Sequence, residues 1–274
     1  MLRTGYEPLI IGLTLVLTLA GCGRNDDLGQ MEVELAPAEL TWIGDQIFQN
    51  ECAGRESCLV HWNEGEAFPS LGIGHFIWYP AGIEGPFVES FPVMIAYLSE
   101  QGVELPDWLS GLEPFDAPWE NREIFLAQSG ADRVRELRAF LSSTRGEQAG
   151  FVVQRAKQAL RRVVLAAPAE QRESMSERIE SLIQTPGGTY ALIDYVNFKG
   201  EGLAEAERYK GQGWGLLQVL QGMLEHQGTP ALTAFRKSAA AVLTRRADNA
   251  EQPIEKARWL PGWLNRLETY REPE

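Results

Sequence analysis

The sequence predicts an α+β fold that is mostly helical, with a small antiparallel β-sheet near the N-terminus. Residues 59–79 are rich in aromatic and β-branched side chains, and turn residues break them at Asn63, Gly65, Gly72 and Gly74. This pattern is typical of two or three short strands joined by tight turns. Most later segments carry apolar residues at helical spacing instead, and a hydrophobic fraction of 44% is ample for a core.

The chain begins with an apolar run at residues 9–20. About a dozen residues are too few to span a bilayer of ~30 Å, and the length suits the hydrophobic region of a signal peptide. The Leu19-Ala20-Gly21-Cys22 segment that follows resembles the lipobox of bacterial lipoproteins. The resemblance implies that residues 1–21 are a signal peptide and that Cys22 carries acyl chains, which anchor the chain to a membrane.

Residues 22–37 are polar and acidic, which predicts a tether, and residues 38–274 then form the folded domain. Gly23 stands where the lipoprotein family has an Asp for inner-membrane retention, so we expect an outer-membrane anchor in the cell envelope, facing the periplasm. No later segment is apolar for long enough to be a transmembrane helix. The net charge of −13 makes nucleic acid a poor partner, because nucleic acids are held by basic patches.

Helical segments follow from apolar periodicity and from start and stop signals. Leu40, Ile43 and Ile47 form one stripe, which predicts a helix over residues 39–51. After a loop at residues 80–86, Pro92 marks the first turn of the next helix. Further helices are predicted at residues 151–166, on either side of residues 186–188, and at 214–224, 230–243 and 254–270.

Two cysteines remain after Cys22. Cys52 and Cys58 form an even pair, and in an oxidising compartment they are expected to close a disulfide. Two free buried thiols are the alternative. The three histidines and these cysteines lack the spacing of a metal site, so neither a metal nor another cofactor is expected.

Glu51 is the candidate acid. Ile43, Ile47 and Glu51 are spaced by four residues and so lie in one row on a helix face. A carboxyl group that continues an apolar row is half buried at the end of the helix, which favours the protonated form that a general acid needs. The alternatives are an exposed side chain just past the helix, or one held by Arg55.

Around Glu51 the chain resembles the phage-type lysozymes over residues 47–76. In that family a catalytic Glu ends the first helix, and a short sheet carries an acidic residue, a Thr six residues later and a Gly-x-Gly-His run. The resemblance implies a general acid, an acidic partner with a hydroxyl that together orient a water, and a backbone that lies close to a sugar ring. The matching residues are Glu51, Glu64, Ser70, Gly72, Gly74 and His75.

Some of these assignments have competitors. Asn63 and Glu66 compete with Glu64 for the role of acidic partner, and the interval from Glu51 to Gly72 is a few residues longer than the family usually has. The 52–58 loop would hold the extra length. A core or hinge position is the main alternative for His75.

Two later segments extend the resemblance. Residues 190–202, which include Asn197, resemble the helix-to-glycine turn that lines the far side of a lysozyme cleft. Residues 259–266 resemble the segment that closes many such domains. The alternatives are a helix C-cap at Gly200 and a buried aromatic anchor formed by Trp259 and Trp263.

A rival acid lies at Glu201. This residue precedes a Gly-Gln-Gly-Trp-Gly-Leu-Leu-Gln segment at 211–218, which resembles a motif of the lytic transglycosylases. In a more modest interpretation, three side chains of this region line a saccharide groove, since indole and amide groups suit sugars. They are Gln212, Trp214 and Gln218.

The expected function is that of a membrane-anchored, lysozyme-like glycosidase of the cell envelope, with peptidoglycan glycan strands or a related amino-sugar polymer as substrate. Two alternatives stay open: a non-catalytic lipoprotein that binds glycan or a partner protein, and a transglycosylase-like enzyme that uses Glu201. A Ser-His-Asp hydrolase is disfavoured because the chain has no Gly-x-Ser-x-Gly elbow. The sequence identifies no protein partner.

Overall fold

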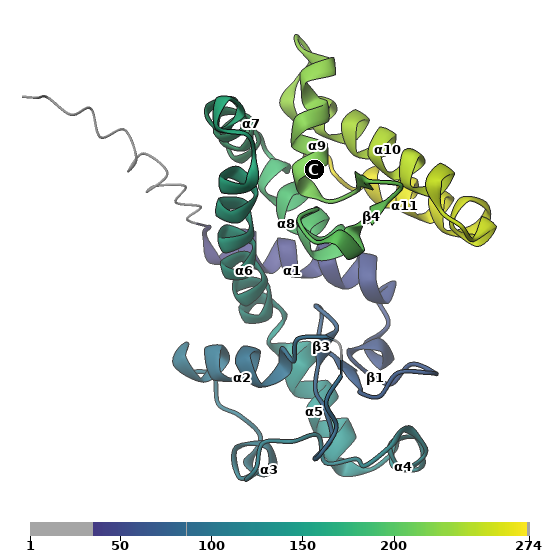
Figure 1. The fold of residues 1–274 in the computed structure, drawn as a ribbon. Helices are drawn as coiled ribbons and strands as arrows, with labels where there is room; N and C mark the ends of the chain where they lie inside the picture. Colours follow the sequence, from purple (N-terminus) through teal and green to yellow (C-terminus); the bar gives the residue numbers. More distant parts are fainter. Residues whose placement is uncertain (1–34, 86, 273–274) are drawn as a thin grey trace, which may run out of the picture. The chain divides into compact units, whose positions relative to one another are not determined.

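The computed structural model describes residues 35–85 and 87–272. The expected signal peptide, Cys22 and nearly all of the expected tether therefore lie outside the described residues. Within the described part of the chain, no helix combines the length and the apolar character that crossing a membrane requires. The structure is mostly helical with a small antiparallel sheet, as the sequence predicted (Figure 1).

The first helix, α1 (Pro37–Cys52), positions the candidate acid. Pro37 occupies its first turn, where a missing N–H costs nothing, and the helix ends at Ala53 in the left-handed conformation. Ile43 and Ile47 of the expected stripe are buried. Gly44 lies so close to the next long helix that an added Cβ would come within 2.7 Å of the Arg145 carbonyl oxygen.

The sheet follows a 3-10 turn, η2 (Glu56–Leu59), and consists of β1 (Val60–His61), β2 (Ser70–Leu71) and β3 (Phe76–Ile77). The strands pair antiparallel in that order, with His61 opposite Ser70 and Ser70 opposite Ile77. Ser70 thus occupies the central strand. The strands are short, and each joins its neighbour within the 59–79 segment that the sequence singled out.

Helices α2 (Phe91–Glu100), α3 (Asp107–Ser110), α4 (Arg122–Ala127) and α5 (Asp132–Ser143) come next. An aromatic cluster fixes α2 to the sheet, because the Trp78 ring lies 4.6 Å from Phe91 and 5.3 Å from Phe115. Large aromatic rings dominate the burial energy of such a small layer.

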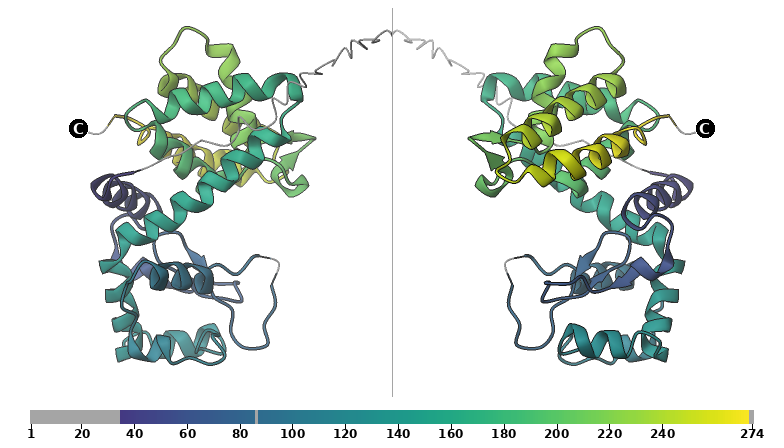
Figure 2. Two further views of the ribbon diagram at one scale, coloured as in Figure 1. Left: turned by 90° about the vertical axis from the view of Figure 1, so that its left-hand side faces the viewer. Right: turned by 90° about the vertical axis from the view of Figure 1, so that its right-hand side faces the viewer.

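The long helix α6 (Arg145–Ala166) packs against α1 and α2 and then against the later helices α7 (Arg172–Ile183), α8 (Gly188–Lys199) and α9 (Leu216–Gly222). Figure 2 shows it extending from the group formed by the sheet and α2–α5 to the group formed by α7–α11. The second group is completed by η3 (Ala169–Gln171), η4 (Glu205–Glu207), η5 (Met223–His226), α10 (Ala231–Asn249), the π-helical segment η6 (Glu255–Trp259) and α11 (Leu260–Leu267).

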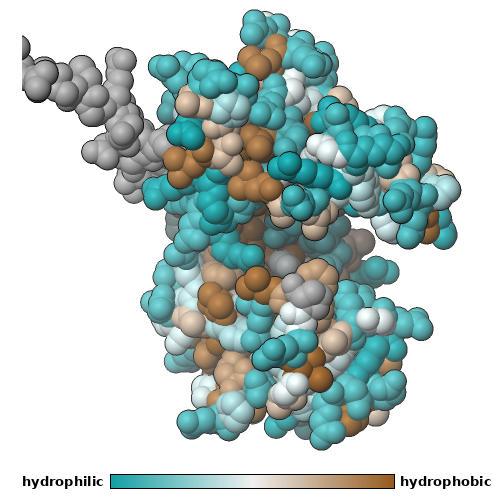
Figure 3. All heavy atoms as spheres, in the orientation of Figure 1, coloured by the Kyte–Doolittle hydropathy of each residue, from teal (hydrophilic) through white to brown (hydrophobic). Residues whose placement is uncertain are grey.

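A second hairpin lies within this group and was not predicted. Strands β4 (Arg208–Tyr209) and β5 (Gln212–Gly213) pair antiparallel around Lys210 and Gly211, which both have positive φ. Strands of two residues are too short to show an alternation of apolar and polar side chains. The Lys210-Gly211 turn is therefore the one feature of the sequence that could have predicted this hairpin. Hydrophilic residues cover most of the face seen in Figure 3, in keeping with an acidic chain.

Candidate functional site

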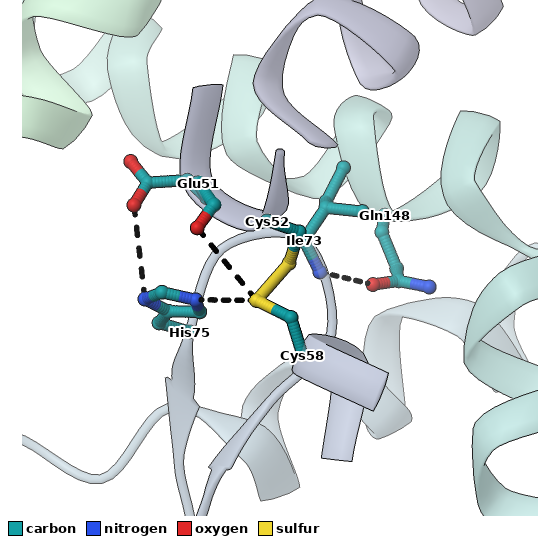
Figure 4. Close-up of a disulfide and its surroundings, with 6 residues drawn as sticks. All are labelled: Glu51, Cys52, Cys58, Ile73, His75 and Gln148. Atoms are coloured by element: carbon teal, nitrogen blue, oxygen red, sulfur yellow. Dashed lines mark hydrogen bonds and ion pairs between the residues drawn. A yellow bond between two sulfur atoms is a disulfide. The ribbon is translucent and has the colours of Figure 1, made fainter. Parts of the chain in front are cut away.

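Glu51 lies at the C-terminal end of α1, where its side chain is 18% exposed. Two basic side chains meet its carboxylate. Arg266 of α11 donates from Nη2 to Oε1 at 2.7 Å, and Nδ1 of His75 lies 3.7 Å from Oε2. Figure 4 shows the His75 ring beside this carboxylate and the adjoining disulfide. The half-buried position agrees with the helix row, whereas the basic partner is Arg266 and not Arg55.

Arg266 is held by a second, buried acid. Nε and Nη2 of Arg266 donate to the two carboxylate oxygens of Asp194, each at 2.8 Å, and the Tyr270 hydroxyl donates to Asp194 at 2.7 Å. Burial alone would lower the pKa of Arg266, but the charges of Asp194 and Glu51 raise it well above its usual value. Arg266 is therefore a fixed cation between two carboxylates.

The residue before Glu51 joins the same network. Asn50 donates to the Tyr190 hydroxyl at 2.6 Å and lies 3.4 Å from the Thr269 hydroxyl. The 190–202 segment, which the sequence associated with the far side of a cleft, and the 259–266 segment, which it associated with the close of the domain, thus both meet the end of α1. The roles of Asp194 and Arg266 were missed, although a lone Asp on an otherwise buried helix face signals a buried partner.

The Cys52–Cys58 disulfide closes the loop directly after Glu51, with a Cα–Cα distance of 5.4 Å. Its Cys58 sulfur lies 3.7 Å from the Glu51 carbonyl oxygen and 3.4 Å from Nε2 of His75. These cysteines and His75 bring possible metal ligands within 4.8 Å of one another. Both sulfur atoms are used in the disulfide, so the thiolates that a metal would need are absent.

His75 takes a positive φ of 48° in the turn directly before β3. Its ring lies between the disulfide and the Glu51 carboxylate, and 38% of the side chain is exposed. It is therefore part of the surroundings of Glu51 and is not a core residue.

The Ser70 hydroxyl lies beside the carboxylate of Glu66. The buried Ser70 hydroxyl lies 3.5 Å from Oε2 of Glu66, to which the Asn63 amide donates at 3.0 Å. Glu64 lies in the exposed turn between β1 and β2. Of the competing acidic partners, Glu66 is the one that the structure brings together with the hydroxyl.

Gly72 and Gly74 allow close packing. Gly72 has a φ of 68°, and a Cβ there would lie 2.4 Å from Oε1 of Gln148. That oxygen accepts the Ile73 backbone N–H at 3.0 Å, as Figure 4 shows. A Cβ on Gly74 would meet the Phe76 ring at 2.6 Å. The glycines thus let the strand connection lie against a buried amide and a ring, and the sequence missed Gln148.

Glu201 forms an ion pair with Arg162. Arg162 of α6 makes three hydrogen bonds to its carboxylate, at 3.2, 3.0 and 2.5 Å. Both residues line a cavity of about 440 Å³ between α6 and α8, together with Asn197. Gly200, with a φ of 81°, caps α8, so the C-cap expected as an alternative is present.

The remaining expected saccharide ligands lie elsewhere. Gln212 and Gln218 line a second cavity of about 480 Å³, and Gln218 also bonds to the backbone of Gly202 and Gly215. Trp214 is buried, with its carbonyl accepting from a tyrosine hydroxyl. Glu51 lines neither cavity.

Next to this network, Lys199 ends α8 with only 9% of its surface exposed. Its side-chain nitrogen lies 3.9 Å from the Phe198 ring centre and 3.6 Å from that of Trp263. Burial, followed by the charges of Arg246 and Arg266, lowers the pKa of Lys199 to about 6. The amine is thus neutral near pH 7.

The site around Glu51 therefore combines a half-buried carboxyl group, a fixed guanidinium, an imidazole and a disulfide-bound loop. Such a set can hold or transfer a proton at a polar ligand and can bind its hydroxyl or carboxylate groups. Comparison of the chain with protein-family models, with curated proteins and with solved structures finds no match.

Proposed function

We propose that this chain is a lysozyme-like glycosidase of the bacterial cell envelope, anchored through lipid on Cys22, which cleaves peptidoglycan or a related amino-sugar polymer. The observation that carries the proposal is the meeting of Glu51 with His75, at 3.7 Å. Glu51 lies at the end of the helix, and His75 is the last residue of the Gly-x-Gly-His run; the lysozyme resemblance rests on these two features. The two residues lie together although the interval from Glu51 to Gly72 is a few residues longer than in the lysozyme family.

In this mechanism Glu51 donates its proton to the oxygen of the scissile glycosidic bond. A second carboxylate with the Ser70 hydroxyl orients the water that attacks from the opposite face of the sugar, as in inverting glycosidases. The 3.5 Å contact between Ser70 and Glu66 supports Glu66 for this role beside Glu64, the residue at the family spacing.

One observation favours a second candidate function, a lipoprotein that binds glycan without cleaving it. The Arg266 guanidinium lies 2.7 Å from Glu51, so the carboxyl group that would donate the proton is paired with a cation. Binding of saccharide hydroxyls by the Glu51–Arg266 pair needs no proton transfer. The transglycosylase-like alternative has weaker support, because Glu201 makes three hydrogen bonds to Arg162.

The test is zymography of the detergent-solubilised lipoprotein on purified cell wall. Glu51→Gln preserves the shape of the side chain and removes the titratable proton, so clearing should fall by about 10²–10⁴-fold. Glu201→Gln is the matched control and should clear the wall like the wild type.

Mass analysis of the new ends separates the alternatives. Reducing ends indicate hydrolysis, and anhydro ends indicate transglycosylation. Loss of clearing in Glu201→Gln but not in Glu51→Gln would show that the acid is wrongly assigned. Binding without clearing, equal in the wild type and Glu51→Gln, would establish the binding-only function.

A further inference from the structure

Trp259 is the most exposed of the tryptophans, all of which lie in the part of the chain that the structure describes. It has 44% of its surface accessible, whereas Trp62, Trp78 and Trp119 are buried. Its neighbour Trp263 is also buried, at 8%. The aromatic anchor expected as an alternative at these positions is therefore Trp263 alone, and the exposure of Trp259 needs another account.

Trp259 shares a helix face with the residue that binds the candidate acid. It ends η6 directly before α11, and positions 259, 263 and 266 are spaced by four and three residues. This spacing places Trp259, Trp263 and Arg266 in one row. Arg266 bonds to Glu51 at 2.7 Å, so the row begins at the candidate site. At 1.5 Å per residue, Trp259 lies roughly 10 Å along the helix from Arg266.

The middle of the row is rigid. The Trp263 ring contacts the Lys199 nitrogen at 3.6 Å and the Arg246 guanidinium at 4.8 Å, and both groups come from neighbouring helices. The Trp259 ring lies 6.2 Å from that of Trp263, with 48° between the planes. The exposed indole is therefore supported from one side by a fixed ring.

We propose that Trp259 is a stacking platform for a sugar unit of the bound glycan, beyond the units that contact Glu51. The inference rests on the proposed function. An indole offers an apolar face to the C–H groups of a pyranose ring and an N–H donor to its hydroxyls. Because the Trp259 position lies roughly 10 Å from Arg266, only a glycan that extends past the sugar units at Glu51 reaches it. The site thus selects long glycan strands over short fragments.

The experiment measures binding of peptide-free peptidoglycan glycan fragments by calorimetry, using the full lipoprotein in detergent. The Glu51→Gln variant serves as the parent, so that no fragment is cleaved. We expect Trp259→Ala in this parent to weaken binding of an octasaccharide by about tenfold, the scale of one aromatic stacking contact, and to leave the disaccharide unchanged.

Two further variants sharpen the result. Trp259→Phe retains an aromatic face and should recover most of the octasaccharide affinity. Leu224→Ala removes an apolar side chain of similar exposure, 45%, from η5, and should bind both fragments like the parent.

Equal octasaccharide affinity in the parent and Trp259→Ala would overturn the platform, and so would equal weakening for both fragments. In either case the parent still binds glycan, so the proposed function stands. A parent that binds no fragment, with a wild type that clears no wall, refutes the proposed function itself. Sedimentation that changes on Trp259→Ala without glycan would assign this face to contacts between copies of the chain and overturn the inference.

Discussion

Replacing Lys199 by Met should stabilise the protein at neutral pH. The Lys199 side chain is 9% exposed and lies between aromatic rings, with the guanidinium groups of Arg246 and Arg266 nearby. Met is unbranched, of similar length and apolar, so it fits the same position without an ionisable group.

The magnitude follows from proton linkage. Burial, then Arg246 and Arg266, lower the pKa of Lys199 to about 6 from its ordinary 10.5, against smaller opposing effects of Glu255 and Glu51. Between these values the unfolded chain binds a proton that the folded chain does not, so stability rises with pH by about 1.4 kcal/mol per unit. Burying Lys199 therefore lowers the free energy of unfolding most below pH 6. The penalty is about 5 kcal/mol at pH 7 and falls to almost nothing by pH 10.5.

The assay is urea denaturation of the wild type and Lys199→Met at pH 7 and at about pH 9. The variant should be more stable by several kcal/mol at pH 7, and the difference should shrink by about 3 kcal/mol over the two units. Lys237→Met, at an exposed position of α10, is the control and should change stability by less than about 0.5 kcal/mol. A variant no more stable than the wild type, or a gain that does not vary with pH, would refute the reasoning.

Three other predictions concern anchoring, the disulfide and the buried ion pair. Cys22→Ala should release the protein from membranes into the soluble fraction, and an intact bond between residues 21 and 22 in the mature protein would contradict the lipoprotein proposal. Unfolded, unreduced protein should show no free thiol at Cys52 or Cys58, and reduction should cost less than the ~3 kcal/mol expected for a 15-residue loop, because the cysteines lie only 6 positions apart. Arg266→Met leaves Asp194 buried without its cation, so denaturation should show a loss of about 3–5 kcal/mol. Adding Asp194→Asn should recover part of that loss, and no recovery would show that the ion pair is not the cause.

The sequence predicted the elements that have a strong local signal. The helix predicted over residues 39–51 is α1, Pro37–Cys52, because its apolar spacing is a local feature. The sheet was predicted from a cluster of strand-forming residues and glycines. Helices α3 and α4 have four and six residues and were not predicted separately, because such short segments carry little periodicity.

The candidate site divides in the same way. The sequence by itself placed Glu51 at a helix end and brought His75 and the cysteines into its neighbourhood, since these residues are close along the chain. Only the tertiary structure decided that Arg266, 215 residues away, binds Glu51, and that Glu66 contacts Ser70. Local periodicity reports which face of an element is apolar. Which charged groups meet depends on how the helices pack, and the burial that lowers the pKa of Lys199 exists only after α8, α10 and α11 have assembled.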